Sequence, residues 1–98
     1  MIDKKIKFKN FEGQEFEFNF RKPRRETGAD GLCYPPKTLS VSKIYVNPHM
    51  SKKRIREVII HELIHAFFWD LPEYKVEKIS KIISKILNKF VYLAKNDS

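Results

Sequence analysis

Two histidines and a glutamate lie close together in His61-Glu62-Leu63-Ile64-His65, which has the pattern H-E-x-x-H. On a helix, the spacing of four residues places both imidazoles on one face, about 40° apart, where they can bind one metal ion. Zn²⁺ suits such a site because it accepts imidazole nitrogens and a carboxylate oxygen in tetrahedral geometry, and keeps one position for water. Glu62 lies about 60° from His65 around the helix, so it can take a proton from the metal-activated water without binding the metal. The pattern therefore predicts Zn²⁺ bound by His61 and His65, with Glu62 as the general base of a hydrolytic reaction.

This motif rarely arises by accident. A random chain with three histidines and eight glutamates in 98 residues would contain roughly 0.007 such matches. A zinc site of this kind needs a third protein ligand, and no histidine follows His65. The candidates among the downstream acidic residues are Asp70, Glu73 and Glu77.

Which carboxylate reaches the histidines depends on where the motif helix ends. If that helix continues one turn past His65 and a second helix returns antiparallel, counting residues places Glu77 level with His65. Glu73 lies nearer the turn and requires a shorter or tilted first helix. Asp70 is better placed to accept an N–H from a ligating imidazole than to bind the metal. Counting alone favours Glu77 and leaves Glu73 open.

Two helices are expected to position the motif. No helix breaker occurs between Ser51, a residue type favoured at N-caps, and Trp69, and Pro72 closes the segment, so we predict a helix over 51–69. Its apolar face should be buried and consists of Ile59, Ile60, Leu63, Ile64 and Phe67. A second helix is predicted over 73–94, with a lysine ridge outside and an apolar side in the core formed by Val76, Ile79, Ile82, Ile83, Ile86, Leu87 and Phe90.

The first half of the chain has the alternation of a small sheet. Residues 4–9 and 15–20 alternate apolar with polar side chains around Gly13, which predicts a β-hairpin within residues 1–20. Glycines and prolines break any periodicity in residues 21–42, which we expect to be an irregular loop. Residues 43–47 should form a third strand. The chain is therefore predicted to be one α+β domain over residues 1–98, with about three strands packed on the motif helix and a C-terminal amphipathic helix.

Composition restricts the possible classes of protein. A chain of 98 residues, 42% of them hydrophobic, has room for one core and is too apolar for a disordered tail. The single cysteine, Cys33, excludes an internal disulfide framework. The start of the chain has no signal-peptide pattern and no run of 18 apolar residues occurs, so we expect a cytoplasmic protein without a membrane partner.

The net charge of +8 adds an alternative interpretation. A positive field of this size attracts nucleic acid without sequence specificity. The alternative to a zinc-dependent metallopeptidase is therefore a basic nucleic-acid-binding module with a structural or vestigial zinc site.

The residues around the motif resemble a known group of proteins. His61–Leu71, followed by Glu73 and Val76, resembles very small zincin-like proteins found in phages and bacteria, and is more remotely similar to SprT-like and ImmA/IrrE-type metallopeptidases. Residues 29–33 and 44–48 extend the resemblance, which covers about residues 29–87. It implies a minimal zincin-like fold and a zinc-dependent peptidase that acts on a protein or peptide. Resemblance to SprT-like proteins also implies cleavage of DNA-associated proteins.

The resemblance implies a particular third ligand. In gluzincin-type proteins of this group, a glutamate that opens the next helix in an E-x-x-V pattern binds the metal, and Glu73-Tyr74-Lys75-Val76 matches that pattern here. The resemblance therefore favours Glu73, with Glu77 as the alternative. It also implies that a strand edge beside the motif helix, here residues 43–47, pairs with an extended peptide substrate.

Three further residues are candidates for supporting roles. Asp70 could hold a ligating imidazole, and Tyr74 or His49 could stabilise an oxyanion or contact the substrate. Cys33 is expected to be a small buried side chain, with a role near the metal as the less favoured alternative.

Overall fold

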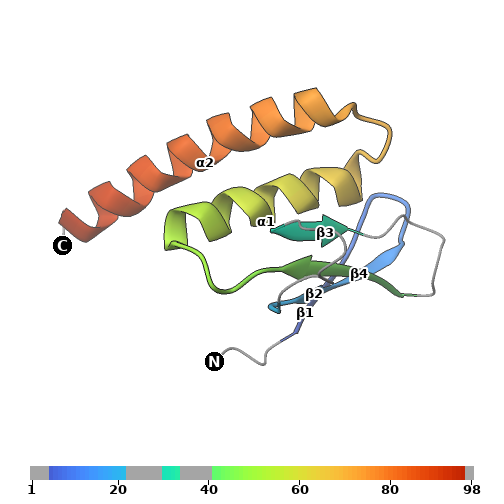
Figure 1. The fold of residues 1–98 in the computed structure, drawn as a ribbon. Coiled ribbons are helices and arrows are strands. Elements are labelled where there is room, and N and C mark those ends of the chain that lie inside the picture. The colour runs from blue at the N-terminus through green and yellow to red at the C-terminus, as the bar shows by residue number, and fades with distance from the viewer. Residues whose placement is uncertain (1–4, 22–29, 34–40, 97–98) are drawn as a thin grey trace.

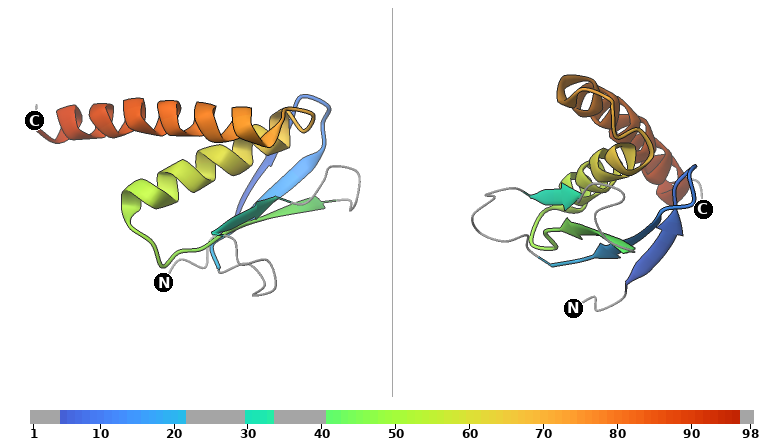
Figure 2. Two further views of the ribbon diagram at one scale, coloured as in Figure 1. Left: turned by 45° about the horizontal axis from the view of Figure 1, so that its top comes forward. Right: turned by 90° about the vertical axis from the view of Figure 1, so that its right-hand side faces the viewer.

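Two helices lie over one face of a four-stranded sheet in the computed structural model, which describes residues 5–21, 30–33 and 41–96 (Figure 1). The elements in chain order are β1 (Ile6–Lys9), β2 (Glu15–Asn19), β3 (Gly31–Cys33), β4 (Val41–Val46), α1 (Lys52–Phe67) and α2 (Glu73–Asn96). Helix α1 lies between the sheet and α2, so the described elements form three layers (Figure 2). The predicted α+β fold, with a small sheet and two helices, is confirmed.

The sheet is mixed and has the strand order β1-β2-β4-β3. Strands β1 and β2 are antiparallel around a turn in which Gly13 adopts a φ of 80°, a conformation that favours glycine. Strand β4 runs parallel to β2 and antiparallel to β3, with Ile44 opposite both Phe18 and Cys33. Two expectations need correction. Strand β3 lies within the segment predicted to be irregular, since three residues are too few to show alternation, and β4 is internal rather than at an edge.

Aromatic and branched side chains from the sheet and α1 form the core. Phe16, Ile44 and Val46 are fully buried between the sheet and α1. The Phe8 ring stacks on Phe16 and on Phe67 of α1, with centroids 5.3 and 5.7 Å apart. This packing fixes α1 against the sheet and therefore sets where the motif histidines lie.

Helix α1 begins and ends at specific hydrogen bonds. The Ser51 hydroxyl accepts from the backbone N–H of Arg54, which is the N-cap expected from the sequence. The helix ends at Phe67, two residues earlier than predicted, where the N–H of Phe68 donates to the carbonyl of Ile64 at 2.7 Å. The buried Asn10 side chain, in the turn after β1, donates to the carbonyl of Ala66. The sheet therefore helps to hold the C-terminal turn of α1.

The buried positions of α1 differ from those predicted. Its most buried side chains are Val58, Glu62 and Ala66, which follow each other at intervals of four residues and face the sheet. The residues predicted to be buried are only half-buried, namely Ile59, Ile60, Leu63, Ile64 and Phe67. The stripe that faces the sheet thus includes Glu62 of the motif, which is not among the residues that sequence periodicity predicts to be buried.

Helix α2 turns a different side toward the protein than its apolar pattern predicts. The buried side chains are Val76, Ser80 and Ser84, again spaced by four residues. The two serine hydroxyls donate to carbonyls of their own helix, so these small side chains pack against α1 with their polar atoms satisfied. Of the residues predicted to be buried, Val76 is buried, and the others are exposed, namely Ile79, Ile82, Ile83, Ile86, Leu87 and Phe90. Neither described helix has the length and apolar character needed to cross a membrane.

Candidate metal centre

His61 and His65 lie one turn apart on α1 and present their rings to the same space. The ring centroids are 4.9 Å apart and the two Nε2 atoms are 3.2 Å apart. Both side chains are half-buried. The i, i+4 spacing thus places two nitrogen donors side by side at the surface of α1.

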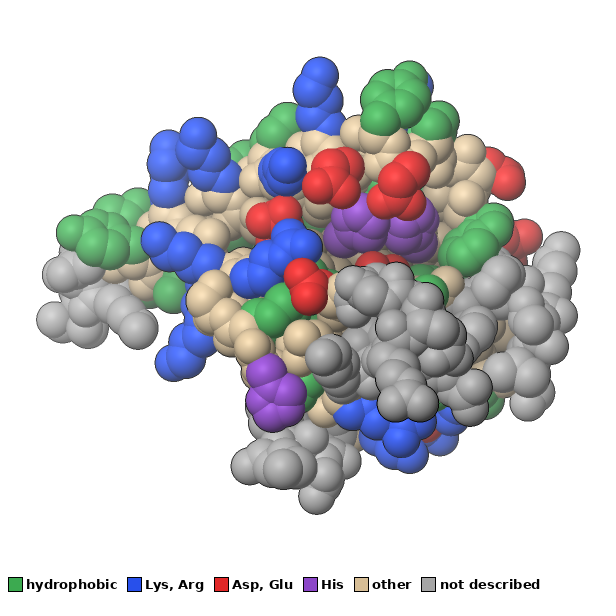
Figure 3. Space-filling view, viewed as in Figure 1, with side chains coloured by type: hydrophobic (Ala, Val, Ile, Leu, Met, Phe, Trp, Pro, Cys, Tyr) green, Lys and Arg blue, Asp and Glu red, His purple; other side chains and the backbone are tan. Residues whose placement is uncertain are grey.

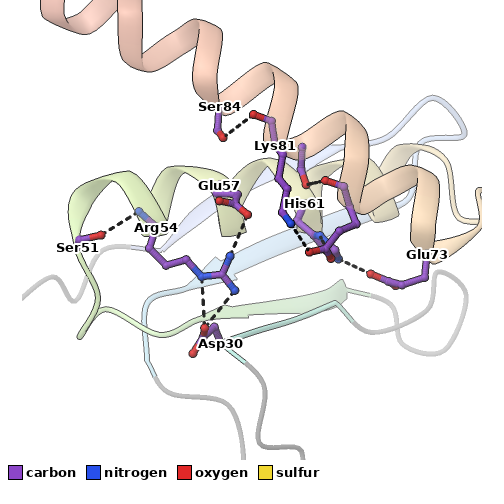
Figure 4. Close-up of polar contacts among 10 residues, drawn as sticks. Asp30, Ser51, Arg54, Glu57, His61, Glu73, Lys81 and Ser84 are labelled. Atoms are coloured by element: carbon purple, nitrogen blue, oxygen red, sulfur yellow. Dashed lines mark hydrogen bonds and ion pairs between the residues drawn. The ribbon is translucent and has the colours of Figure 1, made fainter.

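Glu73 completes a group of three donors from the start of α2. Figure 4 shows its carboxylate directed at His61. Its Oε1 lies 2.7 Å from Nε2 of His61, and its Oε2 lies 3.1 Å from Nε2 of His65. Ligands at zinc–nitrogen and zinc–oxygen distances of about 2.0–2.2 Å in a tetrahedron are separated by about 3.3 Å. The observed separations of 2.7–3.2 Å are close to that value. The three residues therefore fit a divalent metal in both chemical type and spacing.

The early end of α1 explains why Glu73, and not Glu77, reaches both histidines. Because α1 stops at Phe67, the chain reverses sooner and the first turn of α2 lies level with the two rings. Glu77 lies one turn further along, with its Oε2 3.9 Å from Nδ1 of His61 and its Oε1 3.5 Å from Nζ of Lys81. Glu77 is thus next to Nδ1 of His61, the ring nitrogen that does not face Glu73. From the sequence we expect Asp70 to lie beside a ligating imidazole in this way.

Glu62 points from α1 toward β3 and is only 6% exposed. A Cβ at Gly31 would lie 2.8 Å from its Oε2, so any larger residue there would force the carboxylate or the strand to shift. Burial, and then the negative charge of Glu73, raise the pKa of Glu62 to about 7. The environment therefore favours a carboxylate that can both hold and release a proton near neutral pH.

Burial lowers the pKa of His65, and this outweighs the opposing effect of Glu73. A lowered pKa favours the neutral imidazole, which is the form that binds a metal. The Trp69 ring lies against His65, with centroids 5.9 Å apart, and contributes to its shielding.

A cavity of about 700 Å³ opens beside these residues. Its walls come from β3 and from the face of α1 that carries the histidines, and Trp69, Glu73 and Glu77 complete the rim. At one end Arg54 bonds to Asp30 at 3.2 Å and to Glu57 at 3.0 Å, which ties α1 to the start of β3. Figure 3 shows acidic side chains gathered around the paired histidines on this face.

The other candidates from the sequence occupy different places. Asp70, Tyr74 and His49 are exposed and are not among the described residues that line the cavity. Cys33 does line the cavity, and burial, followed by the charge of Glu62, raises the pKa of its thiol to about 12. The thiol therefore stays protonated at neutral pH, which fits a buried side chain better than a metal ligand.

Sequence reasoning missed three contributors to the site. Gly31 makes room for Glu62, Trp69 covers His65, and Arg54 joins the strand to the helix. Gly31 could have been recognised as marking a close approach only once it was known to lie in a strand, and the sequence pattern did not show that strand.

Comparison with known proteins gives one result for this chain. A family model described as the SprT-like family matches residues 3–78. The match includes all four strands, α1 and the first turns of α2, and with them every residue of the candidate metal centre. The chain matches no curated protein and no solved structure.

Proposed function

The chain belongs to the SprT-like family, whose members are related to zinc metallopeptidases, and from this premise we propose that it is a zinc-dependent peptidase. One observation carries the proposal: the Nε2 atoms of His61 and His65 and the two carboxylate oxygens of Glu73 lie 2.7–3.2 Å from their neighbours in this group, close enough for one zinc ion to be shared, beside a buried glutamate.

In this proposal His61, His65 and Glu73 hold the metal. Glu77 lies 3.9 Å from the opposite nitrogen of His61, too far for a hydrogen bond, so its negative charge is near that ring but does not hold it. When bound, zinc makes water a stronger acid and polarises a carbonyl group. The Trp69 ring lies beside His65, with ring centroids 5.9 Å apart, and covers part of that imidazole.

Glu62 is the proposed general base. It follows His61 directly, and its carboxylate borders the cavity that also contains the histidines. A pKa of about 7 lets it accept the proton of the attacking water and then donate that proton to the leaving amine. The Glu62 side chain packs closely against the backbone of Gly31, which limits the positions it can take.

The proposed substrate is a protein or peptide in extended conformation. Strand β3 is the outermost described strand on its side of the sheet, and Gly31, Leu32 and Cys33 line the cavity. An extended chain that adds to this strand would pass directly in front of the histidines. In this respect β3 takes the role that the sequence assigned to residues 43–47.

Replacement of the proposed base tests the function. Glu62→Gln keeps the shape of the side chain but removes its ability to accept a proton, so zinc-loaded protein should lose at least about 100-fold in the rate of casein hydrolysis. Glu57→Gln is the matched control, because Glu57 is on the same helix and lines the same cavity but contacts Arg54 rather than the histidines. Equal zinc content in all three proteins has to be verified. Unchanged hydrolysis by Glu62→Gln, or no hydrolysis by zinc-loaded wild type with or without DNA, would contradict the proposal.

A further inference from the structure

Helix α2 carries an uncovered row of large apolar side chains, here called the apolar stripe: Ile79, Ile82, Ile83, Ile86, Phe90 and Leu93. Each of them is between 38% and 61% exposed. At 100° per residue all six fall within a sector of roughly 100°, so they form one continuous band along four turns of the helix. Contiguous apolar bands of this kind usually mark a contact surface.

The stripe lies outside the part of the chain that the proposed function requires. It begins at Ile79, directly after the family match ends at residue 78. Around the helix, Glu73 lies about 130° from the centre of the stripe, so the stripe faces away from the cavity. Helix α2 also has 24 residues against 16 in α1, and it extends past the start of α1 (Figures 1 and 2).

A row of lysines borders the stripe on the side away from α1. Lys78, Lys85 and Lys89 fall within about 40° of one another around the helix and adjoin the stripe. Residues 78–96 contain five lysines and no acidic residue. Figure 3 shows basic side chains over α2. The surface that covers the stripe must therefore accept apolar side chains and positive charge together.

This combination argues against a second copy of the chain. When two antiparallel helices pair through a two-fold axis, the same flank of each helix meets, so the lysine row of one copy would face the lysine row of the other. In a parallel pair, the lysine row would instead meet the flank that α1 occupies. The antiparallel pair is unfavourable because like charges would lie along the contact. The parallel pair is blocked because α1 already occupies the flank that it needs.

Nucleic acid and an acidic protein helix each match only part of this combination of apolar side chains and positive charge. Phosphates would bind the lysines but leave the isoleucines in water. A partner helix usually seats its apolar face in a groove, whereas the stripe is a convex band on a single outer helix. A lipid bilayer with anionic headgroups takes up the apolar side chains of a convex helix and neutralises lysines beside them.

We propose that α2 binds the surface of an anionic lipid bilayer, lying parallel to it with the apolar stripe inserted and the lysine row at the headgroups. The sequence predicts no membrane partner because no run of 18 apolar residues occurs, but a helix that lies on a bilayer surface needs no such run. Because the cavity faces away from the stripe, the metal centre stays open to substrate while the helix is bound.

Vesicle flotation with the full chain tests the proposal. Vesicles of phosphatidylcholine alone and of equal parts phosphatidylcholine and phosphatidylglycerol are the probes. The wild type should float with the anionic vesicles at low salt and stay unbound with the neutral ones. The variant Ile82→Gln/Ile86→Gln should bind at least about tenfold more weakly, since two half-exposed isoleucines no longer insert. Ile6→Gln is the control, because Ile6 is 53% exposed on β1 and Ile82 is 56% exposed on α2.

The charge requirement has its own matched pair. Lys85→Gln/Lys89→Gln should weaken binding, whereas Lys7→Gln/Lys9→Gln removes the same charge from β1 and should bind as the wild type does. Equal loss in both variants would show attraction by net charge alone and would overturn the proposal.

Failure of the wild type to bind anionic vesicles would also overturn it. Sedimentation equilibrium would then show what covers the stripe instead. If the wild type is a dimer and Ile82→Gln/Ile86→Gln is a monomer, a second copy of the chain covers it. If the wild type is a monomer, an acidic protein is the remaining candidate. Circular dichroism verifies that each variant is folded, which the exposure of the replaced side chains leads us to expect.

Discussion

Gly31→Ala tests the close packing of β3 against α1. The added Cβ would lie 2.5 Å from Cγ1 of Val58 and 2.8 Å from Oε2 of Glu62, against about 3.5–4.0 Å for an ordinary contact. The Val58 and Glu62 side chains, or the strand and the helix themselves, must therefore shift by about 1 Å, and overpacking of this kind costs about 1–3 kcal/mol. The smaller conformational entropy of alanine in the unfolded chain offsets up to about 1 kcal/mol. We expect the free energy of unfolding to fall by about 1–2 kcal/mol and the Tm by roughly 5–15 °C.

A double-mutant cycle identifies the cause of that loss. Val58→Ala removes the nearest methyl group, so Gly31→Ala/Val58→Ala should be at least about 1 kcal/mol more stable than the two single changes predict together. Urea denaturation gives all four stabilities. Gly13→Ala is the control: a Cβ there meets nothing within 4 Å, so its cost comes only from the φ of 80°, and hydrolysis should be unaffected. An unchanged stability in Gly31→Ala, or strict additivity in the cycle, would refute the packing argument.

Two further predictions concern charge. The Lys43 ammonium, 2.8 Å away, holds the pKa of the buried Glu17 below its ordinary value of 4.5, so Glu17→Gln should be less stable than wild type at neutral pH. That difference in stability should disappear as the pH falls through the lowered pKa of Glu17, because protonation then removes the same charge from the wild type. Urea denaturation of both proteins at several acidic pH values measures the difference. A difference that stays constant would contradict the prediction. Nucleic-acid binding through the basic surface stays a prediction: any retention of a DNA duplex should weaken steeply with added salt, and salt-independent retention in filter binding would exclude an electrostatic origin.

Much of the fold follows from local patterns in the sequence. The alternating segments before Gly13 and after it form the paired strands β1 and β2, and the breaker-free stretch after Ser51 forms α1. The resemblance to SprT-like proteins is confirmed over residues 3–78. Resemblance to ImmA/IrrE-type proteins and a phage origin stay predictions.

The rest depended on tertiary contacts that no local pattern contains. The two residues by which α1 is shorter decide whether Glu73 or Glu77 lies level with the histidines, and the contacts around Phe67, including the Asn10 bond to Ala66, set that end. The apolar pattern of α2 correctly predicts a helix but not its orientation, because Ser80 and Ser84 allow closer packing on α1 than isoleucines would. Periodicity alone shows which residues share a face, not which neighbour covers that face.

The zinc content per chain tests the central claim most directly. Elemental analysis after reconstitution and dialysis should find one zinc ion in the wild type and in Glu77→Gln, and none in Glu73→Gln, since Glu73 is the one carboxylate among the described residues that contacts both His61 and His65. Glu77→Gln is the matched control because it removes the same charge one turn further along α2. A wild type that binds no zinc, or zinc that is lost from Glu77→Gln and retained by Glu73→Gln, would contradict the account.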